Sequence, residues 1–315
     1  MYKTVIFDMD GVVTSEEGYW DAAALSVAEF LGYPLDVPAQ LRKEFFYDNR
    51  IIKLLKERGI NSNWDLAYIV IALWNKDAQK LYAELKASEM REDDLYERSA
   101  KRLAEKMPLS EAVRGGAYWQ AIADSFQEWY NGSHAFEKAY HKPAHGGREG
   151  LCKKEVPIVG IPALTETLFA LKEKGVSLRI ATARPDREAR QPLVQWGLID
   201  LMEKGGIISY DMVEKAQNDT GATNLAKPNP YVFIKAYFGE TFQDERIISG
   251  DFPKDFSDCL VVGDAGADLF AAQKMGADFA AVLTGAAGEE AREYFEKNHA
   301  NYIVSDITCL PALWS

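Results

Sequence analysis

Residues 5–14 of the chain read VIFDMDGVVT, an apolar run that ends abruptly in two aspartates and a glycine. Successive β-branched and aromatic residues predict a strand that is buried on both faces, as in a parallel sheet. Asp8 and Asp10 come where this strand ends, and open α/β sheets bind ligands beyond the carboxyl ends of their strands. Gly11 permits a sharp turn and a close approach of the backbone to a ligand. Alone, the stretch is equally compatible with a strand and an ordinary Asp-Gly turn.

Four polar residues further along the chain accompany this stretch: Thr182, Lys227, Asp264 and Asp268. Thr182 and Asp264 each end an apolar run, and Lys227 opens the sequence Lys-Pro-Asn-Pro. In this order after Asp8, the pieces together resemble the haloacid dehalogenase superfamily of aspartyl phosphatases. The resemblance spans Asp8 to Asp268 and says little about residues 15–156.

The composition limits the classes of function. A chain of 315 residues suits two domains, and 47% hydrophobic residues suffice for a substantial core. The formal net charge of -12 argues against a protein that binds nucleic acid or anionic lipid. The three cysteines form no C-x-x-C motif, which favours a reducing compartment. With no signal peptide and no apolar run of about 18 residues, a cytoplasmic protein without a membrane span is expected.

Strand and helix patterns alternate in the second half of the chain, which indicates βαβ units and a parallel sheet. Strands are expected at 176–181, 206–209, 259–262, 279–283 and 302–304. Helices are expected at 161–174, 186–196, 230–238, 267–275 and 289–297. Because the chain leaves the first strand for an insert and then returns, Asp8 is expected on a central strand.

Residues 16–140 show helical periodicity and no strand-like alternation. Helices are expected at 19–31, 41–46, 51–56, 64–74 with Asn63 as its cap, 81–106 as one helix or two, and 119–129. The predicted fold is therefore α/β: a doubly wound, parallel-sheet, Rossmann-like core with an inserted, mostly helical cap. The core comprises residues 1–15 and 156–315, and the cap comprises residues 16–155.

Residues 131–150 contain several glycines and a proline, which predict a loop or linker within the cap. This segment carries His134, His141 and His145. The spacing of His141 and His145 raises the alternative of a metal site. Pro143 between them excludes a helix that would align the two rings, so ordinary loop histidines are favoured over a zinc site.

The resemblance implies a phosphatase whose nucleophile is Asp8. A carboxylate nucleophile divides the hydrolysis of a phosphate monoester into two steps, and a divalent cation neutralises charge. Asp10 is the expected general acid and base. The cofactor implied is Mg²⁺, held by an Asp8 carboxylate oxygen, the Asp10 main-chain carbonyl and Asp264. Asp268 matches a further acidic position of the family, as a direct ligand or as indirect support.

Thr182 and Lys227 are expected to bind the phosphate of a small phosphorylated substrate, through a hydroxyl donor and an ammonium charge. Taken singly, Thr182 is better explained as a β-branched strand residue, and Lys227 as a solvated lysine before a helix. Their order relative to Asp8 and Asp264 favours the binding role.

Asp10 separates branches of the superfamily, because the dehalogenases and the phosphonate-cleaving enzymes lack an aspartate there. The opening sequence also resembles β-phosphoglucomutases and phosphoglycolate phosphatases. The mutases carry a threonine and a histidine in the following hinge, where this chain has Glu16 and Trp20. A hydrolase is therefore favoured, with a phosphomutase or a catalytically inactive regulatory homologue as alternatives.

Substrate specificity is expected to reside in residues that face Asp8. The candidates are Tyr19, Trp20 and Arg50 of the cap and Arg184 beyond Thr182. Arg184 could hold a second anionic group of the substrate at the rim of the site or form a surface ion pair. For Tyr19 and Trp20, packing within the cap is favoured over a contact with substrate. The sequence leaves the substrate and the oligomeric state open.

Overall fold

The computed structural model describes residues 1–60 and 62–314. The chain divides into two compact units, one of Met1–Ser15 with Glu155–Ser315 and the other of Glu16–Lys154. The second boundary lies one residue earlier than expected. We call the first the sheet unit and the second the helical insert.

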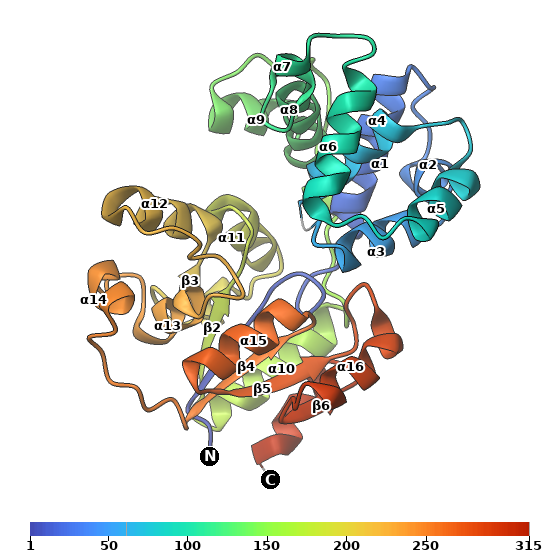
Figure 1. The fold of residues 1–315 in the computed structure, drawn as a ribbon. Coiled ribbons are helices and arrows are strands. Elements are labelled where there is room, and N and C mark those ends of the chain that lie inside the picture. The colour runs from blue at the N-terminus through green and yellow to red at the C-terminus, as the bar shows by residue number, and fades with distance from the viewer. Residues whose placement is uncertain (61, 315) are drawn as a thin grey trace. The chain divides into compact units, whose positions relative to one another are not determined.

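The sheet unit contains a six-stranded sheet in the order β3-β2-β1-β4-β5-β6 (Figure 1). Its strands are β1 (Thr4–Phe7), β2 (Ser177–Ala181), β3 (Ile207–Ile208), β4 (Cys259–Gly263), β5 (Asp278–Val282) and β6 (Tyr302–Val304). Every neighbouring pair is parallel. β1 lies between β2 and β4, so the expectation that Asp8 follows a central strand is confirmed.

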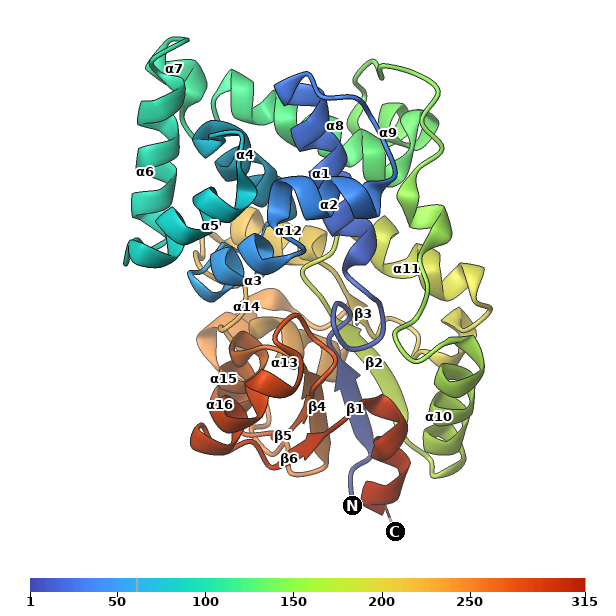
Figure 2. The ribbon, with the colours of Figure 1, turned by 90° about the vertical axis from the view of Figure 1, so that its right-hand side faces the viewer.

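Successive residues of the strands point into two different apolar layers. Ile6, Val261 and Phe279 pack in one cluster, whereas Phe7 and Val262 pack in the other. Each cluster is closed by helices, so both faces of the sheet are covered (Figure 2). Burial on both faces explains why these strands are continuous apolar runs. The predicted doubly wound α/β class is confirmed.

Four of the five helices expected in the sheet unit are observed within one residue of their expected bounds, whereas the helix expected at 289–297 begins at Arg292, three residues later, after a 3₁₀ helix. The observed helices are α10 (Ile161–Glu173), α11 (Asp186–Gln195), α12 (Tyr210–Thr220), α13 (Tyr231–Phe238), α14 (Asp244–Ser249), α15 (Gly266–Met275) and α16 (Arg292–Lys297). The described part of the unit also contains the 3₁₀ helices η2 (Ile199–Leu201), η3 (Gly288–Ala291) and η4 (Ile307–Trp314). The sequence analysis missed α12 and α14, because each buries few apolar residues, with Val213 and Ala216 the buried ones in α12 and Ile247 in α14.

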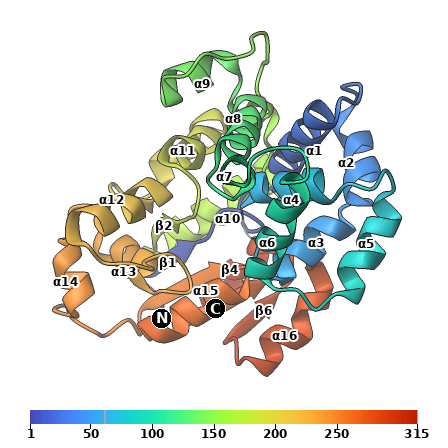
Figure 3. The same ribbon diagram turned by 45° about the horizontal axis from the view of Figure 1, so that its top comes forward.

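The helical insert has its own apolar core, built from residues between Tyr19 and Cys152. Its helices α1 to α9 are labelled in Figure 3. Its elements are α1 (Glu17–Leu31), α2 (Pro38–Phe46), α3 (Arg50–Glu57), α4 (Asn63–Leu73), α5 (Ala78–Ala87), α6 (Glu92–Leu103), α7 (Leu109–Ala112), α8 (Ala117–Asn131), α9 (Ser133–Tyr140) and the 3₁₀ helix η1 (Leu151–Lys154). The segment 81–106 thus forms two helices. Asn63 is the first residue of α4 and not its cap. Within residues 1–60 and 62–314, no helix has both the length and the apolarity of a membrane span.

The expectation of a continuous loop over residues 131–150 is wrong, because α9 occupies residues 133–140. Gly132 adopts a positive φ of 85° and joins α8 to α9, where a side chain would collide with the Glu149 backbone. The glycine is therefore a connection between two helices and not the start of a loop. His141, with a φ of 53°, ends α9, and the chain is irregular from there to Gly150.

Candidate active site

The register of the sheet sets the positions of the acidic residues. Phe7 at the end of β1 is aligned with Val262 in β4. The Asp8 backbone N–H donates a hydrogen bond of 2.8 Å to the Val262 carbonyl. Asp8 is therefore level with Gly263, and Asp264 leaves β4 at the same edge of the sheet. Asp268 stands in the first turn of α15, which starts just after β4.

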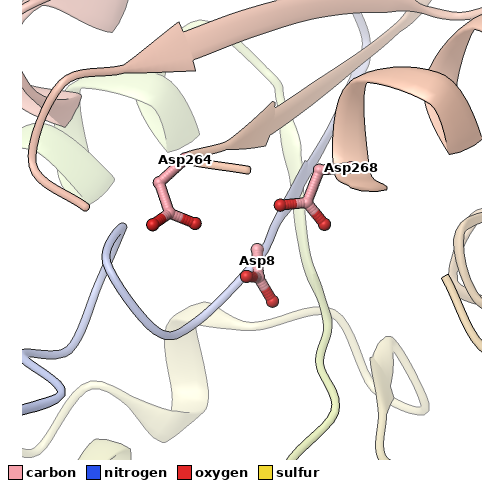
Figure 4. Close-up of side chains that lie close together, drawn as sticks. All are labelled: Asp8, Asp264 and Asp268. Atoms are coloured by element: carbon pink, nitrogen blue, oxygen red, sulfur yellow. The ribbon is translucent and has the colours of Figure 1, made fainter. Parts of the chain in front are cut away.

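The carboxylates of Asp8, Asp264 and Asp268 form one cluster (Figure 4). One oxygen of each lies within 4.8 Å of the others. Asp268 is buried, whereas Asp8 and Asp264 are partly accessible. Among the described residues, this is the one group of histidine, cysteine and acidic side chains close enough to share a metal ion. The predicted convergence of these three aspartates is thus present in the structure.

Lys227 supplies the positive charge of this cluster. Its Nζ lies 2.7 Å from Asp8 Oδ1 and 2.8 Å from Asp268 Oδ1. Burial raises the pKa of the Asp8 carboxyl to about 7, although Lys227 opposes this shift. Burial disfavours the charged ammonium, but Asp268 and Asp8 outweigh burial and hold the pKa of Lys227 above its usual value. Lys227 is therefore charged at neutral pH.

Two glycines pack directly against the Asp264 carboxylate. A Cβ atom on Gly11 or on Gly285 would overlap this side chain. Gly11 has a positive φ of 74°, and its carbonyl accepts a hydrogen bond of 2.5 Å from the Thr284 hydroxyl. The loop after β5 therefore helps to fix the turn after β1. Sequence reasoning missed Thr284 and Gly285, because their role follows from loop packing and from no periodic pattern.

The Asp10 carboxylate binds the guanidinium of Arg184. The guanidinium donates from Nε to Asp10 Oδ2 at 3.0 Å and from Nη2 to Asp10 Oδ1 at 2.5 Å. The Thr14 hydroxyl donates to Asp10 Oδ1 at 3.3 Å. The Asp10 side chain is 25% exposed to solvent. The carboxylate is therefore bound but still accessible.

Thr182 follows β2 and is buried. Its hydroxyl oxygen accepts a hydrogen bond of 3.1 Å from the Arg184 backbone N–H, which shapes the turn after the strand. The alternative of a surface ion pair for Arg184 is wrong, while a contact with a substrate anion stays a prediction. Its side chain is only 2% exposed. The guanidinium instead donates hydrogen bonds to several oxygens of the sheet unit, among them the Asp10 and Glu155 carboxylates.

The specificity candidates of the helical insert have partners within the insert. Tyr19 is buried and stacks on Tyr130, with ring centroids 4.1 Å apart. The Arg50 guanidinium lies 4.7 Å from the centre of the Tyr47 ring and donates to its hydroxyl at 3.1 Å. Trp20 is partly buried against the core of the insert. Tyr19 thus packs in the core, while Arg50 remains exposed.

A doubly wound sheet with acidic side chains at the carboxyl ends of neighbouring central strands defines a class of α/β enzymes. Residues 2–276 match the family of haloacid dehalogenase-like hydrolases. The chain belongs to this family, and the predicted resemblance is confirmed.

Solved structures show how far the fold is shared. A crystal structure from the Northeast Structural Genomics Consortium is 27% identical, with a TM-score of 0.83 over 99% of this chain and 98% of that one. A protein of Bacteroides fragilis, described as a candidate haloacid dehalogenase-like hydrolase, is 14% identical with a TM-score of 0.51, over 98% and 100% of the chains. A candidate phosphatase of Clostridium difficile is 15% identical with a TM-score of 0.50, over 100% and 99%. No curated protein sequence matches the chain.

Proposed function

We propose that this hydrolase is a Mg²⁺-dependent phosphatase that acts on a small phosphorylated metabolite through an aspartyl-phosphate on Asp8. The observation that carries the proposal is the convergence of Asp8, Asp264, Asp268 and Lys227 at one edge of the sheet. These groups come from three separate parts of the chain. A lysine beside a partly accessible carboxylate suits the binding of a phosphoryl group next to its nucleophile.

In the first step, an Asp8 carboxylate oxygen attacks phosphorus and the ester bond to the leaving oxygen breaks. Asp10 gives its proton to the leaving alkoxide. In the second step, water attacks the phosphorus of the aspartyl-phosphate while Asp10 takes a proton from it. The bond to Asp8 breaks, inorganic phosphate leaves, and both aspartates return to their starting states.

The residues present fit a magnesium ion. Three carboxylates face a single ammonium, so the cluster carries more negative than positive charge. Hard carboxylate and carbonyl oxygens are the ligands that Mg²⁺ prefers. Asp8 and Asp264, with the main-chain carbonyl of Asp10, would hold the ion, and Asp268 would be a further ligand or would support the site indirectly. When bound, the ion offsets the negative charge of the phosphoryl group.

Lys227 and Thr182 would bind the transferring phosphoryl group. Without substrate, Lys227 is paired with Asp8 and Asp268, and phosphate oxygens would replace part of this pairing. Thr182 keeps its hydroxyl proton as a donor, since its oxygen accepts the bond from the Arg184 N–H. Both side chains are largely withdrawn from water, which strengthens their attraction for an anion.

The test is the release of inorganic phosphate from a broad panel of phosphorylated metabolites and from para-nitrophenyl phosphate, with Mg²⁺ present. We expect turnover of at least one ester by the wild type and none by Asp8→Asn, which keeps the size of the side chain but removes the nucleophile. Activity that survives in Asp8→Asn would contradict the role of Asp8. Conversion of a sugar 1-phosphate to its 6-phosphate without free phosphate would favour a mutase. No turnover by the wild type would favour an inactive homologue.

A further inference from the structure

One buried guanidinium connects three parts of the sheet unit. Nη2 of Arg184 lies 2.5 Å from Asp10 Oδ1, 2.8 Å from Thr14 Oγ1 and 2.6 Å from Glu155 Oε1. Nη1 donates to the Glu188 carbonyl at 3.3 Å. Arginine presents its donors in a rigid planar fork, so the positions of these acceptors are fixed relative to each other.

The two carboxylates on this guanidinium differ in their surroundings. Glu155 is 3% exposed, whereas Asp10 is 25% exposed. A buried cation that loses its only anionic partner is strongly destabilised. While Glu155 remains bound to Arg184, Asp10 can move away and the buried guanidinium still has a carboxylate partner. Glu155 is therefore the permanent counter-ion of Arg184, and Asp10 is the exchangeable one.

Arg184 also contacts both segments that connect to the helical insert. Thr14 lies two residues before Glu16, where the insert begins, and Glu155 is the first residue after the insert. These two segments pair directly, since the Ile158 N–H donates to the Val13 carbonyl at 3.2 Å. The orientation of Asp10 is thus tied to the place where the chain leaves and re-enters the sheet unit.

We propose that Arg184 is a positioning residue for Asp10, and that Glu155 allows Asp10 to exchange between Arg184 and the leaving oxygen of the substrate. The inference rests on the proposed phosphatase function. It assigns the arginine to the proton-transfer machinery and removes it from the set of residues that bind a substrate anion.

The test compares two esters that differ in their need for a proton. Para-nitrophenolate leaves without one, whereas the alkoxide of glycerol 2-phosphate, or of the best alkyl ester from the metabolite panel, requires protonation. In both cases kcat/KM reports on the steps up to aspartyl-phosphate formation. We expect Arg184→Lys to lower kcat/KM at least about tenfold for the alkyl ester and less than about threefold for para-nitrophenyl phosphate.

The inference further requires that Arg184 acts through Asp10. In the Asp10→Asn background, Arg184→Lys should therefore cause no additional loss on the alkyl ester. Arg190→Lys is the matched control, because Arg190 forms a partly exposed ion pair with Asp186 in α11. It should leave both rates unchanged.

Glu155→Gln is a second variant that tests the same inference if Arg184→Lys does not fold, because it leaves Arg184 itself unchanged. In this variant Asp10 is the remaining carboxylate among the contacts of the guanidinium described above. We therefore expect kcat/KM to fall for the alkyl ester and not for para-nitrophenyl phosphate.

Two outcomes would overturn the inference: equal losses of kcat/KM on both esters, or additive losses in the Asp10→Asn background. In either case, continued release of phosphate by the wild type would still support the proposed phosphatase. A wild type that hydrolyses only para-nitrophenyl phosphate would also overturn it. A wild type that hydrolyses no ester would refute the proposed function itself.

Discussion

Asp264 occupies a position that only glycine neighbours allow. The φ of Gly285 is not positive, so an alanine at this position would not strain the backbone. Its added methyl group would nevertheless overlap the Asp264 carboxylate. The effect of this substitution therefore isolates the position of one side chain.

We expect Gly285→Ala to lower kcat/KM about 10²-fold and to weaken Mg²⁺ binding, because a displacement of about 1 Å is enough for such a loss. Steady-state kinetics and magnesium titration measure both effects. Gly18→Ala is the control, since a Cβ atom there would meet nothing nearer than 3.5 Å. An unchanged rate in Gly285→Ala would show that the position of Asp264 does not matter.

At the scale of residues, the sequence predicted the positions that follow apolar strands. Asp8 and Asp264 meet because parallel strands end at one edge of a sheet. Their catalytic and metal-binding roles, and those of Asp10, Thr182 and Lys227, remain predictions. The partners of Arg184 could not be foreseen, because Thr-Ala-Arg-Pro does not say which way the arginine turns. Its burial depends on Glu155, a residue that no motif marked.

Among the elements, the buried strands of the sheet were the most predictable, since burial on both faces requires continuous apolar residues. Helices with few buried side chains, such as α12, lack that pattern. The α9 helix was not predicted, because the glycines that flank it were interpreted as part of a loop. The segment after α9 is held by a buried carboxylate of α8, Glu128, which sequence periodicity cannot reveal.

Glu128 accepts hydrogen bonds from the Ser133 hydroxyl at 2.8 Å and from the backbone N–H groups of His145 and Gly146 at 3.1 and 3.2 Å. Burial would raise the pKa of this carboxyl, but the hydrogen bonds from His145 and Ser133 outweigh burial and lower it. A lowered pKa means that the folded protein favours the ionised form. The stabilisation is thus complete above the unfolded pKa, and it is lost as the pH falls through the folded pKa.

We therefore expect Glu128→Gln to lower the free energy of unfolding by about 2 kcal/mol at pH 7. This difference from the wild type should shrink as the pH falls below about 4.5, the ordinary pKa of glutamate. Urea unfolding at several pH values measures it. Glu97→Gln, at an exposed pair in α6, is the control and should change little. A difference that grows toward low pH would contradict the assignment.

For the whole molecule, the apolar cores follow the division into two units. All buried residues of the largest helical cluster lie between Tyr19 and Cys152. The clusters on the two faces of the sheet contain residues of the sheet unit alone. In the insert, α1 near its start packs against η1 at its end. Its two ends therefore meet, as an insertion into a loop requires.

We expect residues 16–154, expressed alone, to fold into a helical protein with a cooperative unfolding transition. Far-ultraviolet circular dichroism during thermal and urea unfolding measures this. The full-length chain provides the reference spectrum. A fragment without a cooperative transition would show that the core of the insert depends on the sheet unit.

The most direct test of the proposed chemistry is to trap the phosphorylated aspartate. Wild-type protein is quenched in acid during turnover and reduced with borohydride, which converts an aspartyl-phosphate to homoserine. Peptide mass spectrometry should then find homoserine at position 8 in the wild type and no such product in Asp8→Asn. Rapid phosphate release with no modification at position 8, or with the modification on another residue, would contradict Asp8 as the nucleophile.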